Sequence, residues 1–327
     1  MRLPFSARRR GAAVVLALGA LGCRATPIPE RERWPGASWE THDRVVDGTT
    51  LRVLDAGVGP PVVFVHGLGA SMYTWRAVLR PVLAAGHRVV AFDNRGFGFS
   101  ERPDSGYGNA AYTRLLVALL DSLGIADAVL VGHSMGGAIS AQAAIDHPAR
   151  VRGLVLIGPA GYGVSEPWSL RVARLPLAGR LLSGLRGRWT VAQLLRSTYG
   201  DPSRLTKGDV DQYYATAAVP RSTVALRGVF RDFRFDALRG RLGRVQAPTL
   251  LIWGAQDRWI PMALGREMAL QLANGALVPV PGAGHNVQEE RPDEVVPTLL
   301  AFLSAGLPRP PGDLAVDTPR RIDKSTE

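Results

Sequence analysis

The feature that most constrains the fold is a series of short apolar runs, each of which ends at Gly or Asp. In chain order they read PPVVFVHG, HRVVAFDNRG, ADAVLVGHS, VRGLVLIGPAG and APTLLIWGAQD. Continuous apolar runs of this length are typical of strands buried on both faces of a parallel sheet. Helix-like stretches separate them, at residues 74–84, 111–123, 135–147 and 261–272. This alternation predicts a doubly wound α/β fold with right-handed crossovers.

Further segments complete this organisation. TTLRVLDAG alternates and predicts a first strand, GALVPVPGAGH predicts a last strand, and residues 292–303 predict a last helix. The alternation stops over residues 161–245, which are rich in Leu and Arg and contain no buried-strand run, so we expect a helical cap inserted into the core. The core then comprises residues 41–160 and 246–307, and a chain of 327 residues suits one domain with an insertion. Residues 26–40 predict a linker, and residues 308–327 a disordered tail.

Residues 1–25 indicate a targeting segment. Arginines at positions 2, 8, 9 and 10 precede residues 11–21, an apolar stretch that is short for a membrane span. The chain then reads ALGC, and Cys23 is its only cysteine, so no intramolecular disulfide can form. This end resembles a bacterial lipoprotein signal, with Ala20 where Leu is usual, and the resemblance implies that Cys23 is lipidated. Secretion with cleavage at Ala25 and an uncleaved membrane anchor are the alternatives, and all three place the protein in the cell envelope.

The net charge of +11 is concentrated in two segments. Apart from the N-terminal arginines, residues 166–244 contain fourteen Arg and one Lys against six acidic residues, a net charge of +9. These charges are spread among Leu, Ala and Trp and accompany no nucleic-acid-binding motif, so we expect no nucleic-acid partner. A solvated helical surface near anionic lipid is the simpler interpretation.

The sequence GHSMG at residues 132–136 follows a predicted strand and precedes a predicted helix, which is the context that makes G-x-S-x-G informative. A sharp turn there holds the serine in a strained conformation, and glycine is needed two residues before and after it. Ser134 would then lie at the carboxyl end of the sheet, in front of a helix N-terminus. Gly132, Ser134 and Gly136 therefore predict a nucleophile elbow.

A serine nucleophile needs a base, and the base needs an acceptor that fixes its tautomer. His285 lies in a glycine-rich turn after the last predicted strand, whereas His42, His87 and His147 lie at the edges of elements. Asp257 follows another strand, and the order Ser, Asp, His is that of α/β-hydrolase triads. We expect Ser134, His285 and Asp257 to be catalytic.

The tetrahedral intermediate of acyl transfer also needs donors for its oxyanion. The sequence HGLG follows a buried strand, and its glycines allow an amide to point into the site. We expect the backbone amides of Leu68 and Met135 to form this oxyanion hole. His66, Gly67 and Gly69 would form the supporting turn.

Together these motifs make residues 47–303 resemble the α/β-hydrolase superfamily with a helical cap. The resemblance rests on HGLGAS, AFDNRGFGFSERP, GHSMGG, PTLLIWGAQDRWIP and GAGHNVQEERPDEV. It implies a mostly parallel eight-stranded sheet with helices on both faces, a Ser-His-Asp triad, and neither a metal nor a cofactor. Because function resides in the site rather than in the fold, the substrate is much less constrained.

Differences between this sequence and known subfamilies limit the reactions that it could catalyse. Haloalkane dehalogenases and epoxide hydrolases resemble this chain but carry Asp where Ser134 stands, and carbon–carbon hydrolases usually carry Asn where His133 stands. Proline iminopeptidases have acidic cap residues, unlike this cap. We expect an esterase-like or lipase-like serine hydrolase that acts on a small-molecule ester or lipid and associates with the membrane through its N-terminal lipid. A carbon–carbon hydrolase, an acyltransferase, a cofactor-free haloperoxidase and a non-catalytic envelope binding protein remain alternatives.

Overall fold

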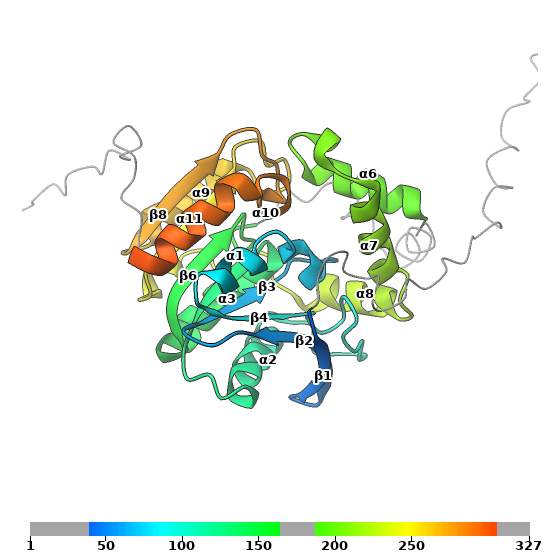
Figure 1. Ribbon diagram of the computed structural model, residues 1–327, viewed down its shortest axis with the longest axis horizontal. Coiled ribbons are helices and arrows are strands. Elements are labelled where there is room, and N and C mark those ends of the chain that lie inside the picture. Colours follow the sequence, from blue (N-terminus) through cyan, green and yellow to red (C-terminus); the bar gives the residue numbers. More distant parts are fainter. Residues whose placement is uncertain (1–38, 164–186, 306–327) are drawn as a thin grey trace, which may run out of the picture.

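A computed structural model describes residues 39–163 and 187–305, which form an eight-stranded sheet with helices on both faces (Figure 1). The strand order is β1-β2-β4-β3-β5-β6-β7-β8. β1 and β2 are antiparallel to each other, β2 is antiparallel to β4, and all other pairs are parallel. The strands comprise Thr41–Val46 (β1), Thr49–Ala56 (β2), Pro61–Val65 (β3), Arg88–Phe92 (β4), Ala128–His133 (β5), Val151–Ile157 (β6), Thr249–Gly254 (β7) and Gly275–Val280 (β8). The predicted α/β-hydrolase architecture, with a mostly parallel sheet, is confirmed.

β1 was not predicted from the sequence, and the strand predicted at TTLRVLDAG is β2. β1 has the sequence THDRVV, and its side chains are mainly exposed because it lies at the edge of the sheet. An edge strand with polar side chains gives no apolar run, so the signal used for the other strands is absent here.

Helices cover both faces of the sheet. One face packs against α2 (Asn109–Ser122), α3 (Met135–Asp146) and α9 (Met262–Gln271). The other packs against α1 (Leu79–Ala84), α10 (Val287–Glu290) and α11 (Pro292–Ala305). Both core clusters consist mainly of aliphatic side chains from the strands and these helices.

The helix expected at residues 74–84 is divided. Met72–Trp75 form a 3₁₀ turn (η2), and the α-helix begins only at Leu79. Pro81 has no N–H to donate and is best tolerated within the first turn of a helix, which favours a start of the α-helix close to it, at Leu79.

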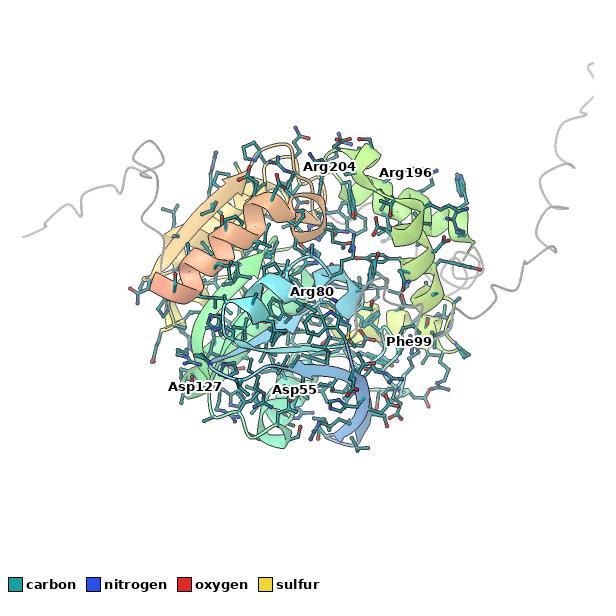
Figure 2. All side chains as sticks on the ribbon, viewed as in Figure 1. Asp55, Arg80, Phe99, Asp127, Arg196 and Arg204 are labelled. Carbon is teal, nitrogen blue, oxygen red and sulfur yellow. The ribbon has the colours of Figure 1, made fainter. Side chains whose placement is uncertain are left out.

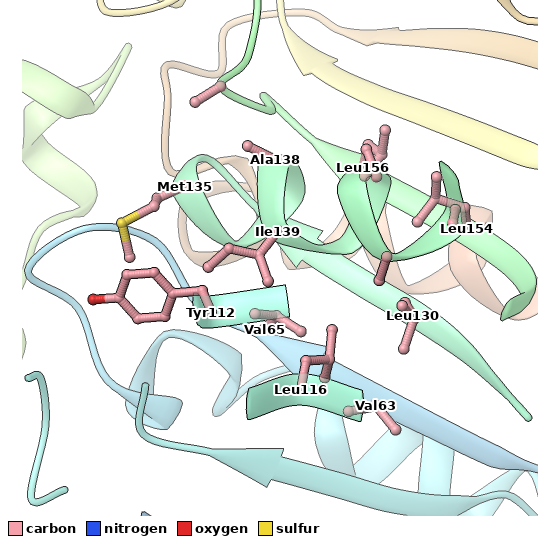
Figure 3. Packing of buried hydrophobic residues seen from close by; sticks show 14 of the residues in the cluster. Val63, Val65, Tyr112, Leu116, Leu130, Met135, Ala138, Ile139, Leu154 and Leu156 are labelled. Atoms are coloured by element: carbon pink, nitrogen blue, oxygen red, sulfur yellow. The ribbon is translucent and has the colours of Figure 1, made fainter. Parts of the chain in front are cut away.

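The core beneath the nucleophile elbow is close-packed (Figure 3). Met135, Ala138 and Ile139 on α3 meet Tyr112 and Leu116 on α2, and all five side chains are buried. Strand residues of β3, β5 and β6 belong to the same cluster: Val63, Val65, Leu130, Leu154 and Leu156. The first turn of α3 is therefore held between another helix and the centre of the sheet.

Between β6 and β7, the described residues form helices and no strand. These are α6 (Arg188–Thr198), α7 (Lys207–Ala217) and α8 (Ser222–Asp232), with 3₁₀ turns at Pro202–Arg204 and Leu242–Arg244. In Figure 1 the three α-helices lie together on one side of the molecule, and we use the name cap for residues 161–245. Part of this range, residues 164–186, lies outside the described residues, as do the predicted targeting segment, almost all of the predicted linker and the predicted tail.

Candidate active site

Ser134 lies between β5 and α3, with φ of 52° and ψ of −118°. A non-glycine residue at positive φ is uncommon and strained, and such conformations concentrate at functional sites. The turn is fixed by hydrogen bonds to the end of β6: the Ser134 amide donates to the Ile157 carbonyl at 3.0 Å, and the Ala160 amide donates to the Ser134 carbonyl at 2.9 Å.

The flanking glycines allow the backbone to approach closely. A Cβ atom on Gly132 would lie 2.6 Å from the carbonyl oxygen of Gly136. A Cβ atom on Gly136 would lie only 2.0 Å from the carbonyl oxygen of Val65 on β3. Both separations are far below ordinary contact, so the elbow and the end of β3 can meet only because these positions lack side chains.

Three side chains from distant parts of the sequence form a hydrogen-bonded series. The Oγ of Ser134 lies 3.0 Å from Nε2 of His285, and Nδ1 of His285 lies 2.7 Å from Oδ2 of Asp257. The ionised carboxylate can only accept, so Nδ1 carries the proton and Nε2 is free to accept from the hydroxyl. The structure thus brings together the three residues that the sequence predicted to be catalytic.

Asp257 is held in place by its own loop. Its Oδ1 accepts from the amides of Trp259 and Ile260, both at 2.8 Å, and its side chain is fully buried. Gly158 lies beside the pair, since a Cβ there would be 3.3 Å from Oδ2 of Asp257 and 3.4 Å from Nδ1 of His285. The ring of Trp259 lies nearly parallel to that of His285, with centroids 6.0 Å apart. Trp259 was not predicted from the sequence, because DRWIP contains no motif that would indicate it.

The HGLG turn lies next to the elbow. A Cβ on Gly67 would lie 3.1 Å from Cβ of Ser134, and Gly69 has a φ of 71°. Leu68 follows directly, and Met135 is the first residue of α3, where N–H groups have no partner within the helix. This places the two expected oxyanion donors on segments that flank Ser134, while their role remains a prediction.

His66 is fully buried and supports this turn. Its Nε2 accepts from the amide of Asn94 at 2.8 Å, so the proton is on Nδ1, which donates to the carbonyl of Gly67 at 2.8 Å. Burial lowers the pKa of His66 to about 4, so the ring is neutral near pH 7. Both ring nitrogens are therefore occupied by hydrogen bonds to backbone groups, and the role of this turn in the site stays a prediction.

His133 links the elbow to the histidine loop, which we define as residues 281–286. Its Nε2 donates to the carbonyl of His285 at 3.0 Å, and the two ring centroids lie 4.9 Å apart. Burial, with a smaller effect of the neighbouring His285, holds the pKa of His133 well below its usual value. A neutral His133 adds no positive charge beside the candidate base.

A buried polar network joins the cap to the core near the site. Arg76, next to η2, makes ion pairs of 2.6 Å with Glu289 on α10 and with Asp209 on α7. Thr74 also donates to Glu289, and so does Tyr213 of the cap. Burial, with the nearby Glu289 carboxylate, raises the pKa of Tyr213, so its hydroxyl stays protonated and donates. These residues were not predicted from the sequence, because no local pattern relates positions 76, 209, 213 and 289.

Many of the cap arginines are neutralised locally. Among the described residues, these cap arginines form ion pairs: Arg188 with Asp211, Arg204 with Asp201, Arg221 with Asp104, Arg231 with Asp232, Arg234 with Asp236 and Arg241 with Asp146. Figure 2 shows Arg196 and Arg204 on the cap side of the molecule, away from Asp55 and Asp127. Four of the paired aspartates lie within residues 166–244 and already enter the net charge of +9 of that segment, so only the pairs with Asp104 and Asp146 reduce the basic excess further.

Within residues 39–163 and 187–305, no group of three or more His, Cys, Asp or Glu residues is arranged to hold a metal ion. No helix in the same ranges is both long enough and apolar enough to cross a membrane.

The doubly wound sheet, the strained serine after β5 and the Ser-His-Asp series define an α/β protein with a nucleophile elbow. The chain belongs to the alpha/beta hydrolase fold family, whose model matches residues 60–292.

The relatives of this chain carry different names. The chain is 30% identical over 246 residues to the "Uncharacterized hydrolase YugF" of Bacillus subtilis (strain 168), covering 74% of this chain and 89% of the relative. It is 31% identical over 268 residues to a 2-hydroxy-6-oxo-6-phenylhexa-2,4-dienoate hydrolase of Burkholderia cepacia, covering 78% and 92%. Among solved structures, a membrane phospholipase A described as a bacterial virulence factor superposes with a TM-score of 0.69 and 28% identity, covering 81% and 86%. The protein is thus a hydrolase of the α/β fold.

Proposed function

We propose that this hydrolase cleaves carboxylic esters through an acyl-enzyme. Ser134 attacks the acyl carbonyl while His285 accepts the hydroxyl proton, and the backbone amides of Leu68 and Met135 bind the oxyanion. His285 then donates the proton to the departing alkoxide. Water, activated by the same histidine, releases the acid and restores Ser134. Asp257 orients the imidazole and stabilises its protonated form.

One observation carries this proposal: the hydrogen-bonded series from Ser134 Oγ to His285 Nε2 and from His285 Nδ1 to Asp257, at 3.0 Å and 2.7 Å. A hydroxyl is a weak nucleophile unless a base is positioned to accept its proton. The strained backbone of Ser134 adds support, because it presents the hydroxyl at the carboxyl end of the parallel strands.

Active-site labelling tests the mechanism. A fluorophosphonate probe should label the wild-type protein, and Ser134→Ala should abolish both labelling and hydrolysis of p-nitrophenyl esters. A series of acyl chain lengths would then define the acyl preference. Labelling of Ser134→Ala at the wild-type rate, or no labelling of the wild type, would contradict the proposed nucleophile.

Hydrolysis of a carbon–carbon bond is the second candidate. The name of the Burkholderia cepacia relative favours it, and the same triad could serve such a reaction. His133 weighs against it, because the carbon–carbon hydrolases that this chain resembles usually carry Asn there. Product analysis separates the candidates: the ester proposal expects turnover of p-nitrophenyl esters well above that of vinylogous 1,5-diketones. The reverse preference would establish the second candidate instead.

We also propose a lipid substrate at the cell envelope. The lipoprotein-like N-terminus supports this location, and the likeness to a membrane phospholipase A supports a phospholipid ester as the substrate class. Mass spectrometry of the mature protein should show a diacylated Cys23 as the first residue. A first residue beyond Cys23, or an unprocessed N-terminus, would contradict the lipoprotein proposal. Release of fatty acid from phosphatidylcholine vesicles tests the substrate class separately.

A further inference from the structure

The loop that carries His285 is bonded directly to the cap. The His285 amide donates to the carbonyl of Thr198 at 2.6 Å, and the Asn286 amide donates to the same carbonyl at 3.4 Å. Thr198 is the last residue of α6. The main chain of the candidate base is therefore fixed by a segment of the cap, although its side chain reaches into the core.

Glycines allow the two backbones to come this close. A Cβ on Gly200 would lie 2.4 Å from the carbonyl oxygen of Gly282. A Cβ on Gly284 would lie 2.4 Å from both the Gly200 nitrogen and the Thr198 carbonyl oxygen. A side chain at either position would force the histidine loop and the cap apart.

A single buried carboxylate connects the two backbones. Oε2 of Glu290 accepts from the Gly284 amide at 2.8 Å and from the Gly200 amide at 3.0 Å, and Oε1 accepts from the Asp201 amide at 2.6 Å. The residue is only 1% exposed. Hydrogen bonds to an ionised carboxylate are shorter and stronger than those between neutral groups. Glu290 therefore holds the histidine loop at a fixed distance from the cap.

We propose that Glu290 is a positioning residue for His285. By holding the Gly284 amide against the cap, it keeps Nε2 of His285 within hydrogen-bonding distance of Ser134. This inference rests on the proposed function, because it assigns to Glu290 the placement of the base in that reaction. It also makes the cap segment at residues 198–201 part of the support of the active site.

Substitution of Glu290 should lower kcat more than it changes KM. Gln has a single acceptor oxygen, so whichever way it turns, its NH₂ group faces at least one backbone N–H. Small displacements of a catalytic group are costly, and we expect kcat for p-nitrophenyl esters to fall on the order of 10- to 100-fold in Glu290→Gln. Glu290→Ala should lose more, and Gly200→Ala should produce a similar loss by separating the same segments. KM should stay within about threefold, because the reacting centre is displaced rather than the contacts that bind substrate.

A second measurement reports the position of the base without turnover. The proton shared by His285 Nδ1 and Asp257 should give a downfield NMR signal in the wild type. That signal should broaden or disappear in Glu290→Ala. Glu289→Gln is the matched control, because Glu289 is the neighbouring buried glutamate and contacts the side chains of Arg76, Thr74, Tyr213 and Tyr199 but no backbone amide of the histidine loop or of residues 198–201. It should lower stability and retain both the NMR signal and kcat. Glu294→Gln, at an exposed position, should change none of these properties.

The outcomes separate this inference from the proposed function. If the wild type hydrolyses esters and Glu290→Ala retains both kcat and the NMR signal, the positioning role is wrong and the proposed function stands. If the wild type shows neither turnover nor labelling, the proposed function fails, and the NMR signal alone decides the role of Glu290. If Glu289→Gln loses kcat and the signal as fully as Glu290→Ala does, the effect is one of stability, and the inference is overturned.

Discussion

Ser134 shows how a few residues determine the chemistry of this site. Its positive φ is maintained by glycines at positions 132 and 136, and its hydroxyl meets His285 from the other half of the chain. The sequence could predict these residues because the elbow motif is local and the order of the triad is characteristic. It could not predict Glu290, because the partners of that side chain are backbone amides whose positions depend on the folded cap.

Two buried titratable groups, His66 and Asp93, change the stability of the folded protein in opposite directions as the pH falls. Burial lowers the pKa of His66 to about 4, so the unfolded chain binds that proton first and stability is lost as pH falls from 6.5 towards 4. Burial raises the pKa of Asp93 to about 6, so the folded protein binds that proton first and stability is gained as pH falls from 6 towards 3.8. The two contributions largely offset each other in the wild type.

His66→Gln should expose this compensation. The variant loses hydrogen bonds and is destabilised at pH 7. The difference in unfolding free energy from the wild type should shrink by about 1.4 kcal/mol for each pH unit between 6.5 and 4.5, because only the wild type loses stability through protonation of His66. Urea unfolding of both proteins across this range measures the difference. His42→Gln, at an exposed position, is the control for the substitution itself. A constant difference for His66→Gln would show that His66 ionises as freely in the folded protein as in the unfolded chain.

The elements differ in how strongly the sequence specifies them. The central strands follow from their apolar runs, whereas β1 and η2 do not, because edge exposure removes the apolar pattern and Pro81 shifts the start of α1. The cap could be recognised as helical, but its attachment to the core could not. Arg76 joins Asp209 of α7 to Glu289 of α10, and no local pattern relates these three positions.

Removing Arg76 should therefore destabilise the junction between α7 and the core. In Arg76→Met, the side chains of Glu289 and Asp209, which are 0% and 6% exposed, lose their cationic partner. Breaking a buried ion pair in this way costs roughly 3–5 kcal/mol, and the unfolding free energy in urea at pH 7 should fall by about that amount. Arg152→Met removes the surface pair with Asp127 and should cost less than about 1 kcal/mol. Equal losses in the two variants would mean that the Arg76 network contributes no more than a surface contact.

At the scale of the whole molecule, the site is assembled from segments that are far apart in the sequence. Ser134 follows a central strand, whereas Asp257 and His285 follow β7 and β8, which lie beyond the cap in the chain. The order of the motifs sufficed to predict the α/β-hydrolase fold, because the carboxyl ends of parallel strands meet at one edge. The reaction is less well specified, since relatives with this architecture carry different names.

The place of β8 as the outermost strand has a consequence for biosynthesis. Ser134 leaves the ribosome before His285, because the cap, β7 and β8 separate them in the chain. A polypeptide that ends before β8 would keep the hydroxyl and lack its expected base, so we expect such a fragment to be inert.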